Sequence, residues 1–441
     1  MKQTSLLALI VLVLAPTANP QDWIRTGTGL GVEKVRLAAP EFQAPDNSGA
    51  SAALVRVFNQ TLWNDLEQAG IFELVSKSFY PLSVPASPQQ IKLEAWSNPP
   101  PNAAMVAFGN LATASEDLAM QGWLYDVKNP ASPLVLGKQY REKATEQNAR
   151  LMAHRFANEI ILRLGGGIAG IAESRIYFIS ARSGNKEVWA MDYDGYGQRA
   201  LTRLGSIALS PKASPDGGRV VFTSYARGGA DLAMYSVELG RMVAFPRYAG
   251  TNSSPSWSPD GSKLAFSSSM RGDPEIFVAD SSGTSAKRLT AFKGPDTSPV
   301  WNPKTGAQLA FVSGRSGLPQ IYLMDTDGTN LQRLTDGGYA VSPSWSPNGQ
   351  FLAFSWIRNY GPGEPGGQDI YIMDLAGKQW VQLTHSGGRN DFPSWSPDGR
   401  HIVYQSTRGG GTHIWTMLAD GSQPRQLTTS GNNTQPHWGA K

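Results

Sequence analysis

Short apolar runs, separated by polar turns, recur from about residue 175 onward. One unit holds the runs Leu264–Phe266 and Ile276–Val278, then a polar turn and the closing segment Arg288–Thr290. Apolar runs of this length between clusters of Gly, Pro, Asp and Ser are typical of short antiparallel strands. No segment of this region keeps the apolar period of a helix, which excludes a solenoid of helix pairs. The pattern predicts four short strands in each unit.

A Pro-x-Trp motif marks the units and fixes their period. It recurs at Pro255–Trp257, Pro299–Trp301, Pro343–Trp345, Pro393–Trp395 and Pro436–Trp438. Successive tryptophans are 44, 44, 50 and 43 residues apart, and a copy with Ala213 in the tryptophan's place lies 44 residues before Trp257. Four strands in a repeat of about 44 residues are typical of a propeller blade.

Two incomplete units complete the blade count. Residues 175–202 contain three strand candidates with no Pro-x-Trp segment before them, and Pro436–Trp438 supplies the missing first strand. Pairing these segments makes one blade from both ends of the array and leaves no exposed sheet edge. We expect an all-β six-bladed β-propeller over residues 166–441, closed by the two ends of the repeat array.

Residues 21–165 follow a different pattern. Helical spacing of apolar residues covers 52–68 and 146–164, and Gly165–Gly167 ends the second helix. The strand candidates between and before these helices are Val35–Ala38, Phe72–Val75, Met105–Phe108, Gly122–Tyr125 and Leu134–Leu136. Strand and helix signals that alternate in this way predict a separate N-terminal α/β domain.

The first residues have the pattern of a secretory signal. Lys2 precedes an apolar run over residues 6–15, and small residues follow near Ala18. The run is too short to span a membrane comfortably. We expect a signal peptide over residues 1–20 and an exported protein with no direct membrane insertion. Residues 21–32 are Gly-rich and lack periodic structure, which predicts a flexible N-terminal arm.

Composition removes several classes of function. The chain has 39 basic and 35 acidic residues, a net charge of +4, and no basic run with interleaved aromatics, so no nucleic-acid partner is expected. It contains no cysteine, which excludes disulfides, thiolate metal sites, cysteine nucleophiles and an N-terminal lipid anchor on cysteine.

The sequence Ser-Pro-Asp-Gly follows Trp257 and Trp395, with Ser-Pro-Asn-Gly after Trp345 and a further copy at 214–217, and it is first a turn. Pro at its second position and Gly at its fourth suit a type I turn between antiparallel strands, and the tryptophan before it is expected to fill the space between blades. The polar residues just before each Pro-x-Trp motif fall where the inner strand starts, at one mouth of the channel. They form either a ring that meets a ligand or partner, or a set of Asx turns. Such a ring of Asp and Asn could also hold Ca²⁺.

Other candidate chemistry is sparse. His401 and His413 fall in one blade, but spacing places no third metal ligand beside them. Gly27–Gly31 has no preceding strand or placed lysine, which favours a flexible arm over a nucleotide loop. No Gly-x-Ser-x-Gly elbow occurs, so nothing favours a serine hydrolase. An exported lyase or glycosidase acting in the channel stays as the alternative, based on the two histidines and the Asp residues at the channel mouth.

The repeats resemble those of the TolB family, periplasmic components of the Tol–Pal cell-envelope system. The resemblance rests on "PSWSPDGSKLAF", "IFVAD" and "RLT" within the units, on "DYDGYGQRALT" at the start of the propeller, and on "FPRYAG" before Trp257. Similar repeats occur in propellers of prolyl-oligopeptidase-type enzymes, but this sequence carries no hydrolase domain after them. The segments follow the same order as in the family: a signal peptide, then an α/β domain, then a propeller.

The resemblance implies a periplasmic, monomeric interaction protein without cofactor or catalytic activity. Its propeller would bind a peptidoglycan-associated outer-membrane lipoprotein, and its N-terminal arm an inner-membrane Tol partner, in support of envelope integrity and cell division. Carried over to this chain, the candidate partner residues are Tyr248, Asn252, Asp296, Thr297, Asn390, Asp391 and Asn433.

Overall fold

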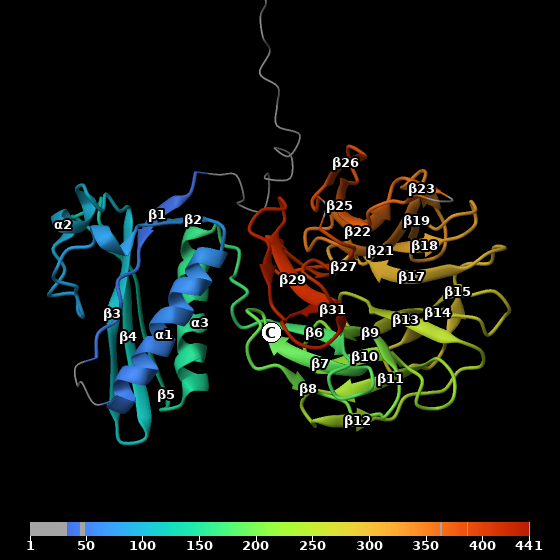
Figure 1. The fold of residues 1–441 in the computed structure, drawn as a ribbon, viewed down its shortest axis with the longest axis horizontal. Coiled ribbons are helices and arrows are strands. Elements are labelled where there is room, and N and C mark those ends of the chain that lie inside the picture. Colours follow the sequence, from blue (N-terminus) through green and yellow to red (C-terminus); the bar gives the residue numbers. More distant parts are fainter. Residues whose placement is uncertain (1–32, 45–48, 362–363, 386, 441) are drawn as a thin grey trace, which may run out of the picture.

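A computed structural model describes residues 33–44, 49–361, 364–385 and 387–440. An α/β domain and a ring of small sheets lie side by side (Figure 1). The predicted signal peptide and arm, residues 1–32, lie outside the described residues, as do residues 45–48, 362–363, 386 and 441. None of the helices in the described part is long and apolar enough to cross a membrane.

The α/β domain contains one five-stranded mixed sheet. Its strands lie in the order β2 (Phe72–Leu74), β1 (Val35–Ala38), β3 (Met105–Ala114), β4 (Asp117–Asp126) and β5 (Leu134–Lys143). Strand β1 pairs in parallel with both neighbours, whereas β3, β4 and β5 form an antiparallel meander. The strands that the sequence predicts in this domain are all present, and the meander strands extend well beyond the predicted apolar runs.

Two long helices cover the face of this sheet that is directed toward the propeller (Figure 1). Helix α1 (Gly49–Gln68) and helix α3 (Glu146–Leu164) pack on each other and on the sheet through apolar residues three and four positions apart, which is the spacing that places side chains on one helical face. The Thr145 side chain caps α3 by accepting a hydrogen bond from the Asn148 amide at 3.2 Å. Short helix α2 (Leu93–Ser97) and the 3₁₀ turn η1 (Lys77–Phe79) lie outside this layer; Trp96 of α2 belongs to a second apolar cluster.

Close packing in the core requires two glycines in the sheet. The Phe42 ring lies 4.9 Å from that of Phe58 and 5.6 Å from that of Phe156. A Cβ on Gly109 would come within 2.4 Å of the Phe42 ring, and one on Gly122 within 2.9 Å of the Phe156 ring. The missing side chains in β3 and β4 therefore let the aromatic layer lie directly on the sheet.

The propeller has six four-stranded blades, as predicted. The inner strands are β9 (Ala208–Ala213), β13 (Asn252–Trp257), β17 (Asp296–Trp301), β21 (Tyr339–Trp345), β27 (Asn390–Trp395) and β31 (Asn433–Gly439). The second strands are β10 (Arg219–Ser224), β14 (Lys263–Ser268), β18 (Gln308–Ser313), β22 (Phe351–Ile357), β28 (His401–Ser406) and β6 (Arg175–Ser180). Strand β31 pairs antiparallel with β6, so both ends of the repeat array close the ring.

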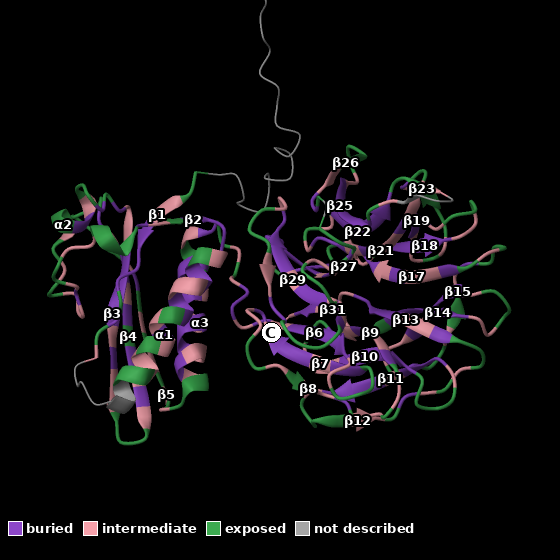
Figure 2. Cartoon of the chain, viewed as in Figure 1, coloured by how far each residue is buried: buried purple, intermediate pink, exposed green. Residues whose placement is uncertain are grey.

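The outer half of each blade is less regular. The third strands are β11 (Asp231–Ser236), β15 (Glu275–Asp280), β19 (Gln320–Asp325), β25 (Asp369–Asp374), β29 (His413–Leu418) and β7 (Glu187–Asp192). The fourth strands are β12 (Arg241–Val243), β16 (Lys287–Arg288), β20 (Gln332–Arg333), β26 (Gln379–Gln382), β30 (Arg425–Gln426) and β8 (Arg199–Ala200). Burial falls toward this edge, as Figure 2 shows for β8 and β12. A hairpin of β23 (Tyr360–Gly361) and β24 (Glu364–Pro365), inserted between β22 and β25, was not predicted.

Buried polar contacts join the two domains. Asp65 of α1 accepts hydrogen bonds from the Tyr193 hydroxyl of the propeller and pairs with His154 of α3 at 2.7 Å. A second contact comes from the start of β28, where the His401 ring nitrogen Nε2 lies 2.7 Å from the Gln68 carbonyl and Arg400 donates to the Gly165 carbonyl at 2.8 Å. Because these groups are buried, loss of either domain would leave polar groups unpaired.

Candidate functional site: the central channel of the propeller

The repeated Ser-Pro-Asp-Gly sequence forms the predicted turn. At Ser258–Gly261 the Gly261 amide donates to the Ser258 carbonyl at 2.9 Å, and the Ser258 hydroxyl accepts from the Lys263 amide at 2.9 Å. Hydrogen bonds from the Ser258 and Ser262 side chains lower the pKa of Asp260 to about 2. The Asp carboxylate is thus used within the turn itself, and the motif is a structural joint.

The tryptophan before each turn lies between blades. The indole of Trp257 donates to the Lys212 carbonyl of the preceding blade at 3.1 Å, and Trp345 makes the equivalent bond to Val300 at 3.1 Å. Each of these rings belongs to an apolar cluster with residues of the preceding blade. Where the ring closes, Trp438 donates to the Ser174 hydroxyl at 2.8 Å.

Four of the predicted partner residues are fully buried, which contradicts their assignment to an accessible ring. They are Asn252, Asp296, Asn390 and Asn433, each with no exposed surface and each the first residue of an inner strand. The Asn252 side chain accepts from Ser268 at 2.6 Å and donates to carbonyls of the loop before it, and Asn433 donates to the Ser430 carbonyl at 2.9 Å. Asn252 and Asn433 thus hold the loops before their strands, and Asn390 donates to the Asp369 side chain of the preceding blade at 3.0 Å.

Asp296 and Tyr248 are also held by structural contacts. The Asp296 carboxylate pairs with Arg315 at 2.8 Å, and burial raises the pKa of Asp296 despite hydrogen bonds and this guanidinium. The Tyr248 hydroxyl donates to the Gly283 carbonyl, and its ring stacks on Phe266 at 5.0 Å. Neither side chain lines the channel.

A further buried network went unnoticed in the sequence. The threonine of each "RLT"-like segment accepts a hydrogen bond from the backbone of the third strand and donates to the first side chain of that strand. In one blade Thr290 accepts from the Ile276 amide at 2.9 Å and donates to Glu275 at 2.6 Å. The same arrangement joins Thr202 to Glu187, Thr335 to Gln320, and Thr384 to Asp369. In the sequence, this network could be recognised from a polar residue that recurs fifteen positions before each of these threonines.

The two histidines considered as metal ligands serve different contacts. His401 binds the α/β domain, and its other ring nitrogen faces Asp398, whereas the His413 ring lies 3.5 Å from the Thr428 hydroxyl in the threonine network. The described residues contain no group of three His, Cys, Asp or Glu side chains that could hold a metal ion. The structure therefore does not bring the two histidines together as a metal site.

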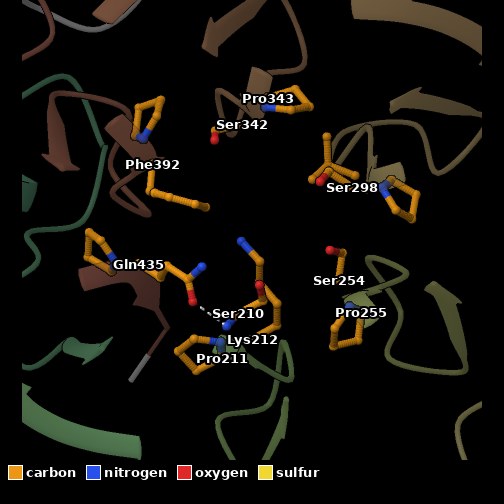
Figure 3. A pocket seen from close by; sticks show the side chains of 14 residues that line it. Ser210, Pro211, Lys212, Ser254, Pro255, Ser298, Ser342, Pro343, Phe392 and Gln435 are labelled. Atoms are coloured by element: carbon orange, nitrogen blue, oxygen red, sulfur yellow. Dashed lines mark hydrogen bonds between the residues drawn. The ribbon is translucent and has the colours of Figure 1, made fainter. Parts of the chain in front are cut away.

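A ring of six residues narrows the channel at mid-depth. Each inner strand has a bulge at the residue before its proline, with φ between 51° and 56°. These residues are Ser210, Ser254, Ser298, Ser342, Phe392 and Gln435. Their side chains converge in Figure 3, and the space among them is about 50 Å³. We call this constriction the waist.

The channel widens on both sides of the waist. The cavity on the side where the inner strands begin, here called the funnel, measures about 600 Å³ and is lined by Thr297, Asp391, Arg389 and several tyrosines. The cavity on the other side, about 420 Å³, is lined by the prolines and tryptophans of the repeated turns. The funnel lining includes no residue from the part of the α/β domain that the structure describes. Of the predicted partner residues, only Thr297 and Asp391 lie in it.

Asp391 is bound within the funnel wall. Its carboxylate accepts hydrogen bonds from the Ser342 hydroxyl at 2.9 Å, the Ser355 hydroxyl at 2.6 Å and the Phe392 amide at 2.7 Å. Burial raises the pKa of Asp391 in spite of these hydrogen bonds. The carboxylate links two blades, and among the described residues that line the funnel it is the one carboxylate.

These features define a class: a six-bladed propeller protein with an α/β domain docked on it, a narrow channel and a polar funnel. A family model described as the TolB beta propeller domain matches residues 163–362 and 337–441. The chain belongs to this family.

Individual relatives agree with this assignment. The chain is 35% identical over 252 residues to the Tol-Pal system protein TolB of Desulfosudis oleivorans, covering 56% of each chain, and 35% identical over 215 residues to the protein TolB homolog of Chlorobium chlorochromatii, covering 48% of this chain and 46% of the relative. The chain thus spans about half the length of the curated relatives it matches.

The solved structures extend the likeness to both domains. The crystal structure of TolB from Acinetobacter baumannii matches 93% of this chain and 97% of its own, with a TM-score of 0.77 and 25% identity. This match confirms the predicted architecture of an α/β domain followed by a six-bladed propeller. The relatives are named for a system and not for a reaction, in agreement with the expected non-enzymatic class.

Proposed function

We propose that this chain is a periplasmic component of a Tol–Pal system, whose propeller binds a peptidoglycan-associated outer-membrane lipoprotein at the funnel. Its membership in the TolB propeller family is the observation that carries the proposal. In this role the protein supports envelope integrity and cell division by joining partners and not by catalysis.

The side chains at the funnel support its use as a docking face. Tyr225 and Tyr360 are 39% and 49% exposed, and the Tyr360 ring lies 5.4 Å from that of Tyr339. Arg389 lines the same cavity. Tyrosine and arginine are the residues enriched at the energetic centres of protein interfaces. None of the described residues of the α/β domain lines the funnel, so the described part of that domain leaves the funnel open to a protein.

The N-terminal arm completes the proposal. Residues 21–32 would bind an inner-membrane Tol protein, as the family resemblance implies. Binding of one partner by a short segment and of another by the propeller would let the protein link the two membranes of the envelope.

The test is a binding measurement with funnel variants. Tyr360→Ser combined with Arg389→Glu removes an exposed ring and reverses a charge at the funnel, so we expect at least about a tenfold loss of affinity for the lipoprotein's soluble domain from the same organism. Leu239→Ser is the matched control, because Leu239 is 57% exposed on the outer edge of a blade. Binding by surface plasmon resonance should be unchanged in the control. Equal binding by the funnel variant and the wild type would overturn the assignment of the funnel.

The N-terminal arm has its own test. Deletion of residues 21–32 from the mature protein should abolish capture of the inner-membrane Tol partner and leave lipoprotein binding at the funnel measurable. No observation favours the alternative of a lyase or glycosidase, because Asp296 is paired with Arg315 and Asp391 is bound by two serines.

A further inference from the structure

A single lysine stands at the waist of the channel. Five of the inner strands carry Ser256, Val300, Ser344, Ser394 and His437 directly after their prolines, and the sixth carries Lys212. Figure 3 shows the Lys212 side chain directed into the middle of the ring. Lys212 is the one charged residue among those that line the waist. Strand β9 thus places a cation where the other strands place a neutral side chain.

This cation has no partner within the described part of the chain. No carboxylate forms an ion pair with the Lys212 ammonium, and no hydrogen bond joins it to another side chain there. Removal from water lowers the pKa of Lys212 to about 8. Burial, and after it the Lys212 charge, hold the pKa of the neighbouring His437 well below its usual value, so this ring is neutral and adds no second charge. Lys212 is partly exposed to the channel, and a poorly hydrated charge of this kind is costly without a counter-ion.

Other hydrogen-bond donors surround the lysine. The hydroxyls of Ser210, Ser254 and Ser298 point into the same ring and have no acceptor among the described residues. An anion at the waist would accept from these hydroxyls and from the ammonium together, and charge-assisted bonds of this type are the strong ones. The Lys212 ammonium would repel Ca²⁺, so this part of the channel does not suit a calcium ion.

We propose that the waist binds one carboxylate group, held by the Lys212 ammonium and the serine hydroxyls around it. A single positive charge balances a monoanion, and a space of about 50 Å³ suits a small planar group better than a hydrated dianion. The two wide cavities give access from both faces. The group belongs either to a small free carboxylate or to an acidic side chain of a segment that enters the funnel. This inference does not depend on the proposed lipoprotein.

The test is saturation-transfer NMR on the full mature chain in chloride-free buffer, with acetate and the blocked peptide acetyl-Gly-Asp-Gly-amide as separate probes. We expect transfer to the acetate methyl group in the wild type and its loss, by at least about fivefold, in Lys212→Met, which keeps the stem and removes the charge. Lys263→Met is the matched control, because Lys263 is an exposed lysine of the neighbouring blade. Its signal should equal that of the wild type.

The outcomes distinguish a free carboxylate from an acidic side chain of a protein segment, and both from the absence of a carboxylate site. Transfer to acetate supports a free carboxylate, and transfer to the peptide alone supports delivery by a protein segment. No transfer to either probe, equal transfer in Lys212→Met, or complete displacement by equimolar chloride would overturn the carboxylate site. A circular dichroism spectrum and melting curve of Lys212→Met that match the wild type establish that a lost signal is not a lost fold.

Discussion

The turns between the strands and the lining of the channel are built from the same repeats, yet they differ in how far their copies agree. The turns repeat Ser-Pro-Asp-Gly or a close variant, and the hydrogen bonds at Ser258 recur at Ser214, Ser346 and Ser396. The waist instead contains Phe392, Gln435 and Lys212 beside serines and neutral residues.

This difference separates residues that maintain the blade from residues free to serve a ligand. A joint that must close every blade tolerates little change, because its groups are buried and satisfy one another. A side chain directed into the channel is not needed to close a blade, so one copy can depart from the others without breaking a joint. Departures from the repeat are therefore the better guide to function here.

Breaking a joint should have the largest effect. Trp345→Ala removes a buried ring between two blades and its hydrogen bond to the Val300 carbonyl, so we expect a loss of about 3–5 kcal/mol in the free energy of unfolding. Urea denaturation followed by circular dichroism measures it. Trp380→Ala provides the comparison, because Trp380 is 43% exposed on an outer strand, and it should cost far less. Similar losses in both variants would contradict the role of the inner tryptophan as an interblade wedge.

Breaking the buried pair at the start of an inner strand comes next. Asp296→Ala leaves the Arg315 guanidinium without its partner. Because the Arg315 side chain is only 11% exposed, its unpaired charge stays largely buried, and we expect a loss of about 3 kcal/mol in the free energy of unfolding. Thr297→Ala, at the adjacent funnel position, should change stability by no more than about 0.5 kcal/mol. Thermal melting of both variants makes the comparison. A normal melting temperature for Asp296→Ala would restore this residue as a functional candidate.

The domain interface should show a smaller, pH-dependent effect. Burial alone would lower the pKa of His154, but the charge and hydrogen bond of Asp65 outweigh it and raise the pKa. The stabilisation by the pair is therefore complete below the unfolded value of 6.5 and is lost as pH rises through the folded pKa. The stability difference between wild type and His154→Gln should shrink by about 1 kcal/mol across that window. Melting curves from pH 5 upward test this; a difference that grows with pH would contradict the assigned protonation.

The smallest expected effect comes from the channel lysine. Lys212→Met removes a poorly solvated charge, so in carboxylate-free buffer near pH 7 we expect a gain of about 1 kcal/mol in the free energy of unfolding. Because the folded pKa, about 8, lies below the unfolded value of 10.5, wild-type stability should rise between these two pH values and the gap should close. A pH series of denaturation curves measures the gap. A constant gap would mean that the ammonium is already compensated.

Local patterns predicted most of the fold. Helix α3 has the bounds expected from its apolar spacing, Glu146–Leu164, and the predicted blade made from both ends of the array is present as β31 beside β6. These features depend on residues close in sequence or on a repeat that can be compared with itself. The turn and wedge roles of the Ser-Pro-Asp-Gly segments followed from the same comparison.

The polar contacts between distant segments could not be found in this way. Asn252 precedes a turn motif and looks like a surface residue in the sequence, but the second strand closes over it and Ser268 binds its side chain. His401 resembles half of a metal pair, yet its partner is the carbonyl of Gln68, 333 residues away. Lys212 stands in the most divergent repeat, where Ala213 replaces the tryptophan, and a lysine in one strand alone gives no recurring pattern to compare.

The closure of the propeller also has a consequence for the order of folding. The Arg182 guanidinium bonds the Asn433 side chain across 251 residues of chain, and β31 pairs with β6 over a similar interval. Contacts so remote in sequence carry the entropy of a very long loop and form slowly. Individual blades can assemble beforehand, but the sixth exists only when its two separated parts meet. Completion of the ring is therefore the expected late, rate-limiting event, and until then the edges of β9 and β27 lack the neighbour that covers them.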